Sequence, residues 1–451
     1  MNIGGNVIRK TDILIVGTGC AGLYCALHLP KDRSILMITK SDAKSSDSYL
    51  AQGGICMLRN EADYDSFFYD TMKSGHFEND QEAVEIMIRS SPSVIRDLVS
   101  YGVLFDRGPH GEFSYTKEGA HSERRILYHK DITGEEITRK LLVAVKRLPN
   151  VDILEHTTMV DLVCIENGCC GAVVRAQNGE NRTICSNYTV LATGGIGGLY
   201  AHSTNWRHLT GDAVAVALKH NIECKDLNYI QIHPTTLYSD KKEDRSFLIS
   251  ESVRGEGAKL YDKNMHRFVD ELLPRDRLTE KILLQMEKDQ TKFVWEDLRG
   301  IPAKELTEHF PNIVEHCRKM GYDVTEECIP VVSAQHYYMG GIKVTHNGKS
   351  SMERLYAIGE TACTGVHGRN RLASNSLLES LVFAKRSAVE IGESFSSSYA
   401  NEVACKKYDL SKCADFKTLS KEYRQLVLEK IAELDNRKTK RFPQEENSKD
   451  V

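Results

Sequence analysis

The chain has 451 residues, with 59 lysines and arginines against 63 aspartates and glutamates, which gives a formal net charge of −4. No basic excess points to a nucleic-acid partner or an anionic membrane surface, so we expect neither. Apolar residues make up 41% of the chain and charged residues 27%, a mixture that excludes disorder. At about 100–200 residues per domain, the length predicts two to four domains, or one large α/β domain with an insertion.

The 13 cysteines are scattered, and none stands in a C-x-x-C pair. This spacing argues against a zinc or iron–sulfur site, so we predict no metal centre. No apolar stretch typical of a secretory signal precedes Ile13, and no run of about 18 apolar residues is present. We therefore expect a cytoplasmic protein without a membrane segment, whose thiols are unpaired and mostly buried. A disulfide-bonded protein is the less favoured alternative.

A βαβ unit is predicted near the N-terminus. Residues 12–16 form a short apolar run, residues 23–29 have helical apolar spacing, and residues 34–39 form a second buried strand. Between the first strand and the helix stand Gly17, Gly19 and Gly22. The first glycine permits a tight turn, the second lets backbone approach a pyrophosphate, and the third lets helix and strand pack closely. We predict a dinucleotide site here; a glycine-rich structural turn is the alternative.

The residue at the end of the second strand departs from the usual NAD pattern. A ribose-binding Asp or Glu is expected there, and the chain has Lys40. This weakens an NAD assignment. Lys40 could contact a cofactor phosphate or ribose through its ammonium, and a solvated lysine at a strand end is an equally good interpretation.

Two later segments favour FAD over NAD. Residues 191–195 end a β-rich region with glycines, and Glu360 follows a buried strand, where its carboxylate could accept hydrogen bonds from ribitol or ribose hydroxyls. Asp212 stands near the start of a helix predicted over residues 213–218, and an N-cap role is an equally good interpretation of it.

The rest of the chain alternates helices and short strands. Helices are predicted at 80–100 and 135–147, and strands at 152–154, 160–165, 171–174 and 188–193, with Asn167-Gly168 and Asn178-Gly179 as hairpin turns. Residues 41–54 are interpreted as a loop. The charged C-terminal tail is predicted to be helical, with Tyr423, Leu426, Val427, Ile431 and Leu434 on one face, and the basic run 437–441 is interpreted as solvated.

Several long motifs occur in a characteristic order. They are Ala51-Gln-Gly-Gly-Ile55, Lys117-Glu-Gly-Ala-His-Ser122 with Arg125-Ile126, Gln231-Ile-His-Pro-Thr235, Glu251-x-x-Arg-Gly-Glu-Gly257, Pro274-Arg-Asp276, His336-Tyr-Tyr-Met-Gly-Gly341 and His367-Gly-Arg-Asn-Arg-Leu-Ala-Ser-Asn-Ser376. With them the chain resembles the flavoproteins of the succinate dehydrogenase/fumarate reductase superfamily. Within that superfamily it is most similar to the L-aspartate oxidases, from about residue 11 to residue 393.

The resemblance implies an α/β fold with an inserted domain. A Rossmann-like FAD-binding domain would comprise residues 1–226 and 337–395, interrupted by an α+β capping domain that carries substrate residues at 227–336. Residues 396–451 would form only a short C-terminal helical region, where longer members have a fuller helical bundle.

The resemblance also implies how FAD is held. In the dehydrogenases a histidine four residues before the Ala-Gln-Gly-Gly motif is bonded covalently to the flavin. Asp47 stands at that position here, so the FAD should be non-covalent. The residues expected to bind it are Gly17, Thr18, Gly19, Cys20, Ala21, Gly22, Lys40, Asp47, Ser48, Ala51, Gln52, Gly53, Gly54, Val160, Asp161, Thr193, Gly194, Asp212, Glu360, Asn375, Ser376 and Leu377.

The substrate implied by the resemblance is a small dicarboxylate that carries an amine. Arg371 suits bidentate capture of a carboxylate. The other residues expected in the pocket are His233, His336, Ser250, Arg275, Glu251 and Glu118. Arg275 would combine a carboxylate contact with proton shuttling, because a free guanidinium is a poor base. Glu118 would orient the substrate ammonium. Taken singly, a histidine is usually structural, and Arg275 beside Asp276 and Arg277 could be a solvated charge cluster.

The implied reaction is oxidation of L-aspartate to iminoaspartate, with oxygen or fumarate as electron acceptor. The product would pass to quinolinate synthase, as the first step of NAD biosynthesis. Two other hypotheses stay open from sequence. One is a soluble fumarate reductase or succinate dehydrogenase subunit, against which Glu118 and Asp47 argue. The other is a non-catalytic flavoprotein that scaffolds a partner.

Overall fold

The structure is a computed structural model that describes residues 8–166, 168–240, 245–397 and 399–441. Its largest sheet has a parallel part in the order β6 (Val151–Leu154), β2 (Ile35–Ile38), β1 (Ile8–Val16) and β9 (Asn181–Leu191), and β16 (Leu355–Ala357) pairs with the end of β9. Helix α1 (Cys20–His28) follows β1. The predicted βαβ unit is therefore confirmed, although α1 begins three residues early because the glycine turn is so short.

Two further strands extend this sheet in antiparallel fashion. Strand β7 (Thr158–Ile165) pairs with β8 (Gly168–Arg175), which pairs with the first half of β9. The predicted turn at Asn178-Gly179 is confirmed, since Gly179 has a φ of +84° and its N–H donates to the carbonyl of Ala176 over 2.9 Å. In the other predicted turn, Asn167 lies outside the described residues.

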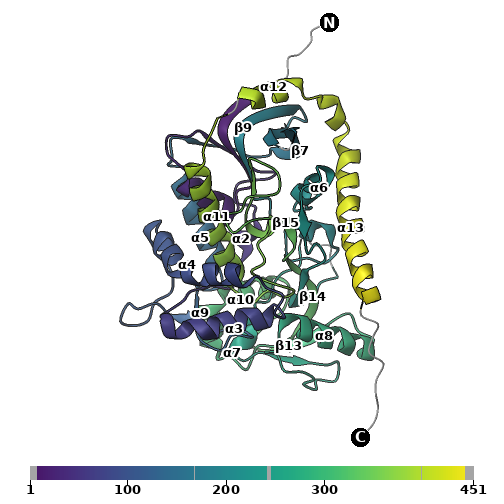
Figure 1. Cartoon of the computed structure of the whole chain (residues 1–451). Helices are drawn as coiled ribbons and strands as arrows, with labels where there is room; N and C mark the ends of the chain where they lie inside the picture. Colours follow the sequence, from purple (N-terminus) through teal and green to yellow (C-terminus); the bar gives the residue numbers. More distant parts are fainter. Residues whose placement is uncertain (1–7, 167, 241–244, 398, 442–451) are drawn as a thin grey trace.

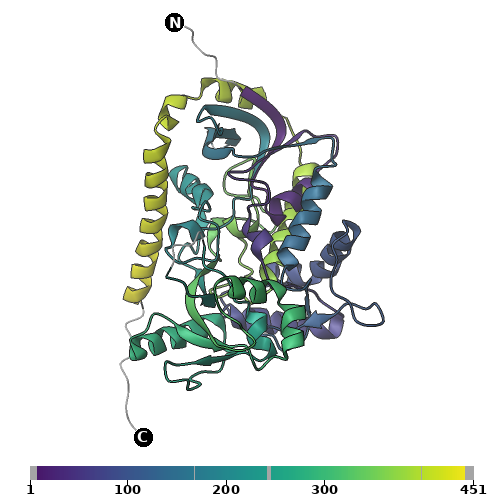
Figure 2. The ribbon, with the colours of Figure 1, turned by 180° about the vertical axis from the view of Figure 1, so that it is seen from behind.

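Helices cover both faces of the sheet (Figures 1 and 2). One apolar core lies beneath α1, α4 (Gln81–Ser100), α5 (Thr133–Val145) and α11 (Asn375–Glu393), and a second lies beneath α6 (Asp212–Lys219). The predicted helices at 80–100 and 135–147 are thus confirmed within two residues. The loop predicted over residues 41–54 contains one short helix, α2 (Asp47–Leu50), and α3 (Tyr64–Ser74) follows it.

A second body occupies the lower part of Figure 1. Its antiparallel sheet has the order β11 (Ile230–Leu237), β14 (Ile329–Tyr338), β13 (Val294–Asp297) and β12 (Lys259–Tyr261). It carries α7 (Glu251–Glu256), α8 (Arg275–Asp289), α9 (Ala303–His309) and α10 (Pro311–Lys319), and it has an apolar core of its own. We call this body the cap. Asp131 of the main body accepts hydrogen bonds from the N–H groups of Asn312 and Ile313 at the start of α10.

The described residues also form two small three-stranded sheets. Strands β3 (Ile55–Cys56), β5 (Ile126–Leu127) and β4 (Tyr115–Thr116) form one, and β10 (Cys224–Lys225), β15 (Gly341–Lys343) and β17 (Ala362–Cys363) form another. Both lie close to the segments that carry predicted site residues.

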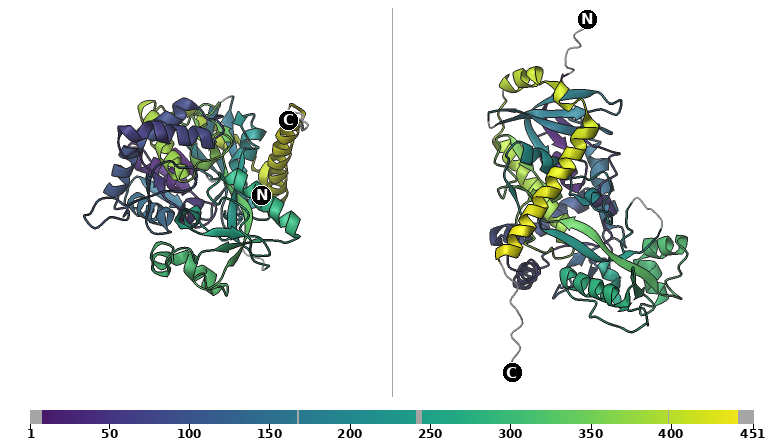
Figure 3. Two further views of the ribbon diagram at one scale, coloured as in Figure 1. Left: turned by 90° about the horizontal axis from the view of Figure 1, so that it is seen from below. Right: turned by 90° about the vertical axis from the view of Figure 1, so that its right-hand side faces the viewer.

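The C-terminal region forms α12 (Tyr399–Lys407) and a long helix, α13 (Phe416–Arg441). Figure 3 shows α13 crossing one side of the molecule. The predicted apolar face is confirmed for four of its five residues: Tyr423, Val427 and Ile431 are buried in the core shared with α6, and Leu434 packs against it. Leu426 is half-buried and is not part of that core. The side chains of the basic run 437–441 lie outside the described ones.

All 13 cysteines have free thiols, and most are buried, as predicted. Across the part of the chain that the structure describes, no helix is both long and apolar enough to cross a membrane.

Candidate active site

A cavity of about 200 Å³ runs from the glycine turn after β1 to the cap. Most predicted site residues line it. These are Gly17, Thr18, Gly19, Ala21, Lys40, Asp47, Ser48, Ala51, Gln52, Gly53, Gly54, Thr193, Gly194, Asp212, Glu360, Ser376 and Leu377 for the cofactor, and Glu118, His233, Ser250, Glu251, Arg275, His336 and Arg371 for the substrate. Five predicted cofactor residues are not in the lining: Cys20, Gly22, Val160, Asp161 and Asn375.

The glycine turn has the shape that a dinucleotide site requires. A Cβ on Gly17, where φ is +119°, would lie 2.0 Å from the carbonyl oxygen of Ala192, and one on Gly22 would lie 2.2 Å from that of Gly17. These two glycines therefore let the turn and α1 pack against β9. Gly19 lies on the cavity wall at the start of α1, whose positive dipole end favours a diphosphate. This arrangement fits FAD.

Cys20 and Asn375, two of the predicted cofactor residues, do not line the cavity. The side chain of Cys20 lies in the core, while its N–H donates to Oγ of Ser48 over 3.2 Å. Asn375 is fully buried at the start of α11, where its Nδ2 donates to Oγ1 of Thr71. Both residues support the wall, and their side chains do not reach the cavity.

Lys40 forms a half-buried ion pair at the wall of the cavity. Its Nζ lies 2.6 Å from Oδ2 of Asp212 and also donates to the carbonyl of His208. The interpretation of Lys40 as a solvated lysine is therefore wrong. The N-cap interpretation of Asp212 is wrong as well, because Gly211 caps α6 and the carboxylate accepts hydrogen bonds from Lys40 and Thr210.

Val160 and Asp161, which were predicted to bind the cofactor, lie outside the cavity lining. The cavity is lined instead by residues 157–159, which directly precede Val160 in the same segment. Val160 is fully buried, and its carbonyl accepts a hydrogen bond from Tyr423 of α13. The carboxylate of Asp161 lies 2.7 Å from Nζ of Lys219 and also accepts a hydrogen bond from Tyr408. These contacts hold the C-terminal helices to the sheet.

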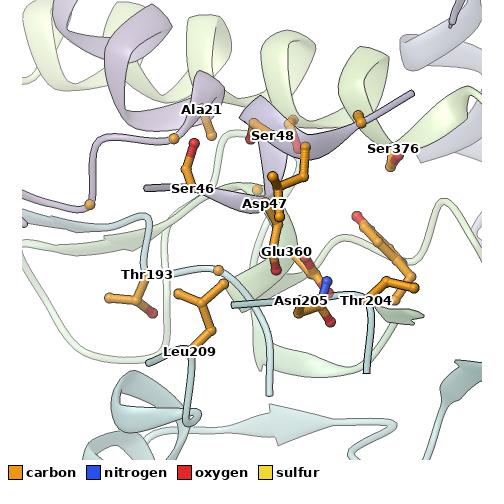
Figure 4. A pocket seen from close by; sticks show the side chains of 18 of the residues that line it. Ala21, Ser46, Asp47, Ser48, Thr193, Thr204, Asn205, Leu209, Glu360 and Ser376 are labelled. Carbon is orange, nitrogen blue, oxygen red and sulfur yellow. The ribbon is translucent and has the colours of Figure 1, made fainter. Parts of the chain in front are cut away.

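Asp47 and Glu360 lie beside each other in the middle of the cavity (Figure 4). Asp47 Oδ1 accepts from the N–H of Trp206 over 3.0 Å, and Glu360 Oε1 accepts from that of Tyr338 over 2.9 Å. Oδ2 of Asp47 is buried and has no protein partner. Burial raises the pKa of both carboxyls, and the charge of Asp47 raises that of Glu360 further. These two carboxyls can hydrogen-bond hydroxyl or ring atoms of the cofactor. Neither has the imidazole that forms a covalent bond between histidine and flavin, so the site fits non-covalent FAD.

At the cap end His233 and His336 face each other, with ring centroids 5.0 Å apart. Burial lowers the pKa of both well below the ordinary value, and the charge of Arg275 lowers it further, so both rings are neutral. Nδ1 of His336 lies 2.7 Å from Oγ1 of Thr204, which can donate to it and leave Nε2–H for a carboxylate.

Thr235 holds the ring of His233 from its Nδ1 side. Nδ1 lies 2.9 Å from the carbonyl oxygen of Thr235 and 3.2 Å from the N–H of the same residue, so it can donate to the first or accept from the second. Nε2 is buried without a protein partner. When Nδ1 accepts from Thr235, the proton of the neutral ring is on Nε2, which can then donate to a substrate carboxylate as predicted.

Arg275 and Glu251 form a buried ion pair. Each is the first residue of its helix, and Nε of Arg275 donates to Oε2 of Glu251 over 2.6 Å, while another guanidinium nitrogen donates to Gln231 over 2.9 Å. Burial raises the pKa of Glu251, but Arg275 and Arg254 lower it by more, so the carboxyl is ionised. Arg275 is therefore part of a buried network and not of a solvated cluster.

Arg371 is held on the opposite wall. One of its guanidinium nitrogens donates to Ser376 over 3.0 Å, the guanidinium lies 4.5 Å from the ring centre of Tyr337, and Nε is buried without a protein partner. Burial, together with the charge of Arg275, lowers the pKa of Arg371 to about 10. A cation desolvated in this way is suited to bind a carboxylate.

Glu118 is a second buried carboxyl near Glu251. Its two oxygens accept hydrogen bonds from Ser252 over 2.8 Å and from Ser374 over 2.7 Å. Burial raises the pKa of Glu118, and the charge of Glu251 raises it further. Glu118 therefore has an increased affinity for a proton or an ammonium group.

Sequence reasoning did not single out several residues that complete this end. Ser252, Ser374 and Gln231 each lie inside a quoted motif, which is the signal that could have found them. Ser250, which it did name, caps α7 by accepting from the N–H of Ser252. Thr204 and Arg245 also line the cavity, and no motif pointed to them.

Comparison with known proteins agrees with this geometry. The family described as FAD binding domain matches residues 12–377. E. coli quinol fumarate reductase FrdA superposes with a TM-score of 0.82 at 26% identity, over 98% of this chain and 84% of that chain. The protein is thus a flavoprotein of the fumarate reductase type, with FAD as its cofactor.

Two curated relatives narrow the class. The L-aspartate oxidase of Clostridium perfringens is 51% identical over 383 residues, which are 85% of this chain and 87% of the relative. That of Clostridium acetobutylicum is 48% identical over 87% of this chain and 90% of the relative. The chain belongs to the L-aspartate oxidase family. The predicted fold class, family and cofactor are confirmed.

Proposed function

We propose that this protein oxidises L-aspartate to iminoaspartate with FAD as hydride acceptor. The observation that carries the proposal is Glu118, a buried carboxyl with two hydroxyl donors in a cavity that already contains Arg275 and Arg371. A dicarboxylate without an amine needs the arginines but has no use for this additional carboxylate. A substrate with an ammonium group does need this carboxylate, because the ammonium pairs with a desolvated carboxylate.

The substrate groups match the residues at the cap end in charge. Arg371 binds one carboxylate, and Arg275 with His336 binds the other. Glu118 orients the ammonium. Glu251 keeps Arg275 in place through the 2.6 Å contact and balances its charge. Burial of this end excludes water, which strengthens each of these interactions.

The chemistry follows from this placement. Bound FAD supplies a hydride acceptor at N5 of its ring system. Glu118 accepts a proton from the substrate ammonium, which leaves the amine lone pair that drives departure of hydride from Cα. Its raised pKa favours this transfer. Arg275 contacts the substrate carboxylate. The Arg275–Glu251 pair relays the second proton, which the N–H bond of the iminium product releases as iminoaspartate forms, because an isolated guanidinium is a poor base.

We further propose that oxygen or fumarate reoxidises the enzyme and that iminoaspartate passes to quinolinate synthase for NAD biosynthesis, in the cytoplasm. Similarity to a quinol fumarate reductase supports fumarate as an acceptor. Free thiols at all 13 cysteines fit a reducing compartment. Assays with L-aspartate as donor, comparing oxygen with fumarate, would identify the acceptor.

An anaerobic reductive half-reaction tests the main proposal. L-Aspartate should bleach the flavin absorbance of the holoenzyme, and succinate, which lacks the amine, should not. Equal bleaching by succinate would favour a succinate dehydrogenase or fumarate reductase instead, and bleaching by neither would leave a non-catalytic flavoprotein. Glu118→Gln should lower the rate of bleaching by L-aspartate roughly a hundredfold or more.

A further inference from the structure

A second, much smaller cavity of about 20 Å³ lies behind the cap end of the main one. Gln52, Gly53 and Gly54 line both cavities, so this segment forms part of the wall between them. Oε1 of Gln52 is buried and has no protein partner. A polar space of this size is sufficient for one water molecule.

Ser252 connects the two cavities. Its side chain lines the small one, and its hydroxyl hydrogen-bonds Oε1 of Glu118, which lines the main one, over 2.8 Å. A serine hydroxyl can accept one proton and donate another by rotation. The hydrogen bond between Ser252 and Glu118 therefore crosses the wall.

The far side of the small cavity reaches the surface. Glu256 lines it and lies four residues after Ser252 on α7, so the two side chains share a helix face. Oε2 of Glu256 lies 2.9 Å from Nδ1 of His309, the last residue of α9. The side chains of Glu256 and His309 are 26% and 39% exposed, so His309, the more exposed of the two, is the group that exchanges protons with solvent.

We propose that Glu118, Ser252, one water in the small cavity and the Glu256–His309 pair form a proton exit path from the active site. The inference rests on the proposed function. An N–H bond of the substrate ammonium breaks and an O–H bond forms on Glu118. Glu118 then passes its proton to Ser252 while the Ser252 hydroxyl proton moves to the water, and Glu256 takes that proton from the water and passes it through His309 to solvent. Glu118 is thereby ionised again for the next turnover.

The path predicts a difference between the first turnover and later ones. A holoenzyme whose Glu118 starts ionised can complete one flavin reduction without the exit path, whereas steady turnover needs it. In Glu256→Gln and His309→Gln holoenzymes, the first anaerobic bleaching by L-aspartate should therefore stay within roughly threefold of the unmodified rate. Steady-state kcat should fall about tenfold or more, and its solvent deuterium isotope effect should rise.

Matched variants separate proton transfer from positioning. Ser252→Thr keeps a hydroxyl and should retain turnover. Glu308→Gln, next to His309 and 60% exposed, should leave every rate unchanged. Added imidazole should restore turnover of His309→Ala. A purely structural role for the Glu256–His309 pair would slow the first bleaching in their variants and weaken L-aspartate binding, and imidazole would not restore turnover of His309→Ala.

The outcomes distinguish this path from the proposed function. If L-aspartate does not bleach the unmodified holoenzyme, the proposed function fails and the path fails with it. If it does, but the Glu256 and His309 variants turn over normally, only the exit path is overturned. The path is also overturned if the first bleaching falls as much as kcat in every variant.

Discussion

Arg275 and Glu251 approach within 2.6 Å where the first turns of α8 and α7 meet, and both side chains are at least nine-tenths buried. A carboxylate at a helix start is stabilised by the dipole, and an arginine there is not. Glu251 therefore compensates an otherwise unfavourable cation, and it holds that cation at the wall of the cavity.

Glu251→Gln should impair both stability and chemistry. Leaving Arg275 buried without its partner should lower the free energy of unfolding by about 3–5 kcal/mol. Flavin reduction by L-aspartate should slow roughly a hundredfold. Urea unfolding in saturating FAD and anaerobic stopped-flow measure the two effects. The matched control is Glu280→Gln, which lies exposed on α8. A variant as stable as the control would contradict a charge-compensating role for Glu251.

Arg371→Leu should remove dicarboxylate binding. Loss of a desolvated partner costs about 2–5 kcal/mol, which is roughly a thirtyfold to several-thousandfold rise in Kd for succinate. Succinate binding can be followed by perturbation of the flavin spectrum, with FAD content confirming an intact fold. The neighbouring, exposed Arg369→Leu should bind normally.

The same arginine predicts a pH dependence. Because the pKa of Arg371 is lowered to about 10, its binding cation is complete at neutral pH and is lost as pH rises through that value. Succinate affinity should therefore fall above a pH of about 10 in the unmodified protein. Affinity independent of pH in that range would show that Arg371 is not the carboxylate-binding cation.

Asp161→Asn should destabilise the attachment of the C-terminal helices. Burial raises the pKa of Asp161, but hydrogen bonds from His220, Lys219 and Tyr408 lower it by more, to about 2. A carboxyl with a lowered folded-state pKa stabilises the fold above its unfolded value of about 3.9, and that stability is lost as pH falls towards the folded pKa. The variant should lose about 2 kcal/mol at pH 7.

Unfolding by urea at several pH values tests this sign. The difference between the unmodified protein and Asp161→Asn should shrink between pH of about 4 and about 2. Asp32→Asn, whose carboxylate is 70% exposed, serves as the control and should be nearly neutral. A constant difference at all pH values would mean that the carboxylate charge is not what holds the helices.

The position of Asp161 outside the cavity also shows which parts of the site a sequence can predict. The glycine turn was predictable because its requirements are local: three glycines between one strand and one helix. The partners of Glu118 were not, because Ser252 and Ser374 are 134 and 256 residues away in the chain. The position of Asp161 depends on which side of β7 meets α6 and α13, and that is decided by packing of the tail.

The same distinction holds for the fold. Apolar periodicity predicted α4, α5 and the buried face of α13, since each has a continuous amphipathic pattern. It did not predict α2, because its four residues contain no buried side chain. The ion pair of Lys40 was not predicted, for the reason that applies to Glu118: its partner, Asp212, is 172 residues away.

Gly19→Ala and Gly22→Ala should separate cofactor binding from folding within one turn of helix. A Cβ on Gly19 would meet only Ser48 Oγ at 3.3 Å and Ser46 Cβ at 3.7 Å, so the fold can accept it. It would project from the wall beside the expected pyrophosphate, and the Kd for FAD should rise about tenfold or more because backbone approach is blocked. Stability measured in saturating FAD should change little.

Gly22→Ala should behave in the opposite way. Its Cβ would lie 2.2 Å from the carbonyl of Gly17, a backbone atom that cannot move without shifting the turn. Overpacking of this kind costs about 1–3 kcal/mol, so the midpoint of thermal unfolding should fall even when FAD is saturating. Fluorescence titration with FAD and thermal unfolding, applied to both variants, measure the two properties independently. If both variants lose affinity and stability in the same proportion, the glycines do not divide these roles, and the turn acts as a single unit.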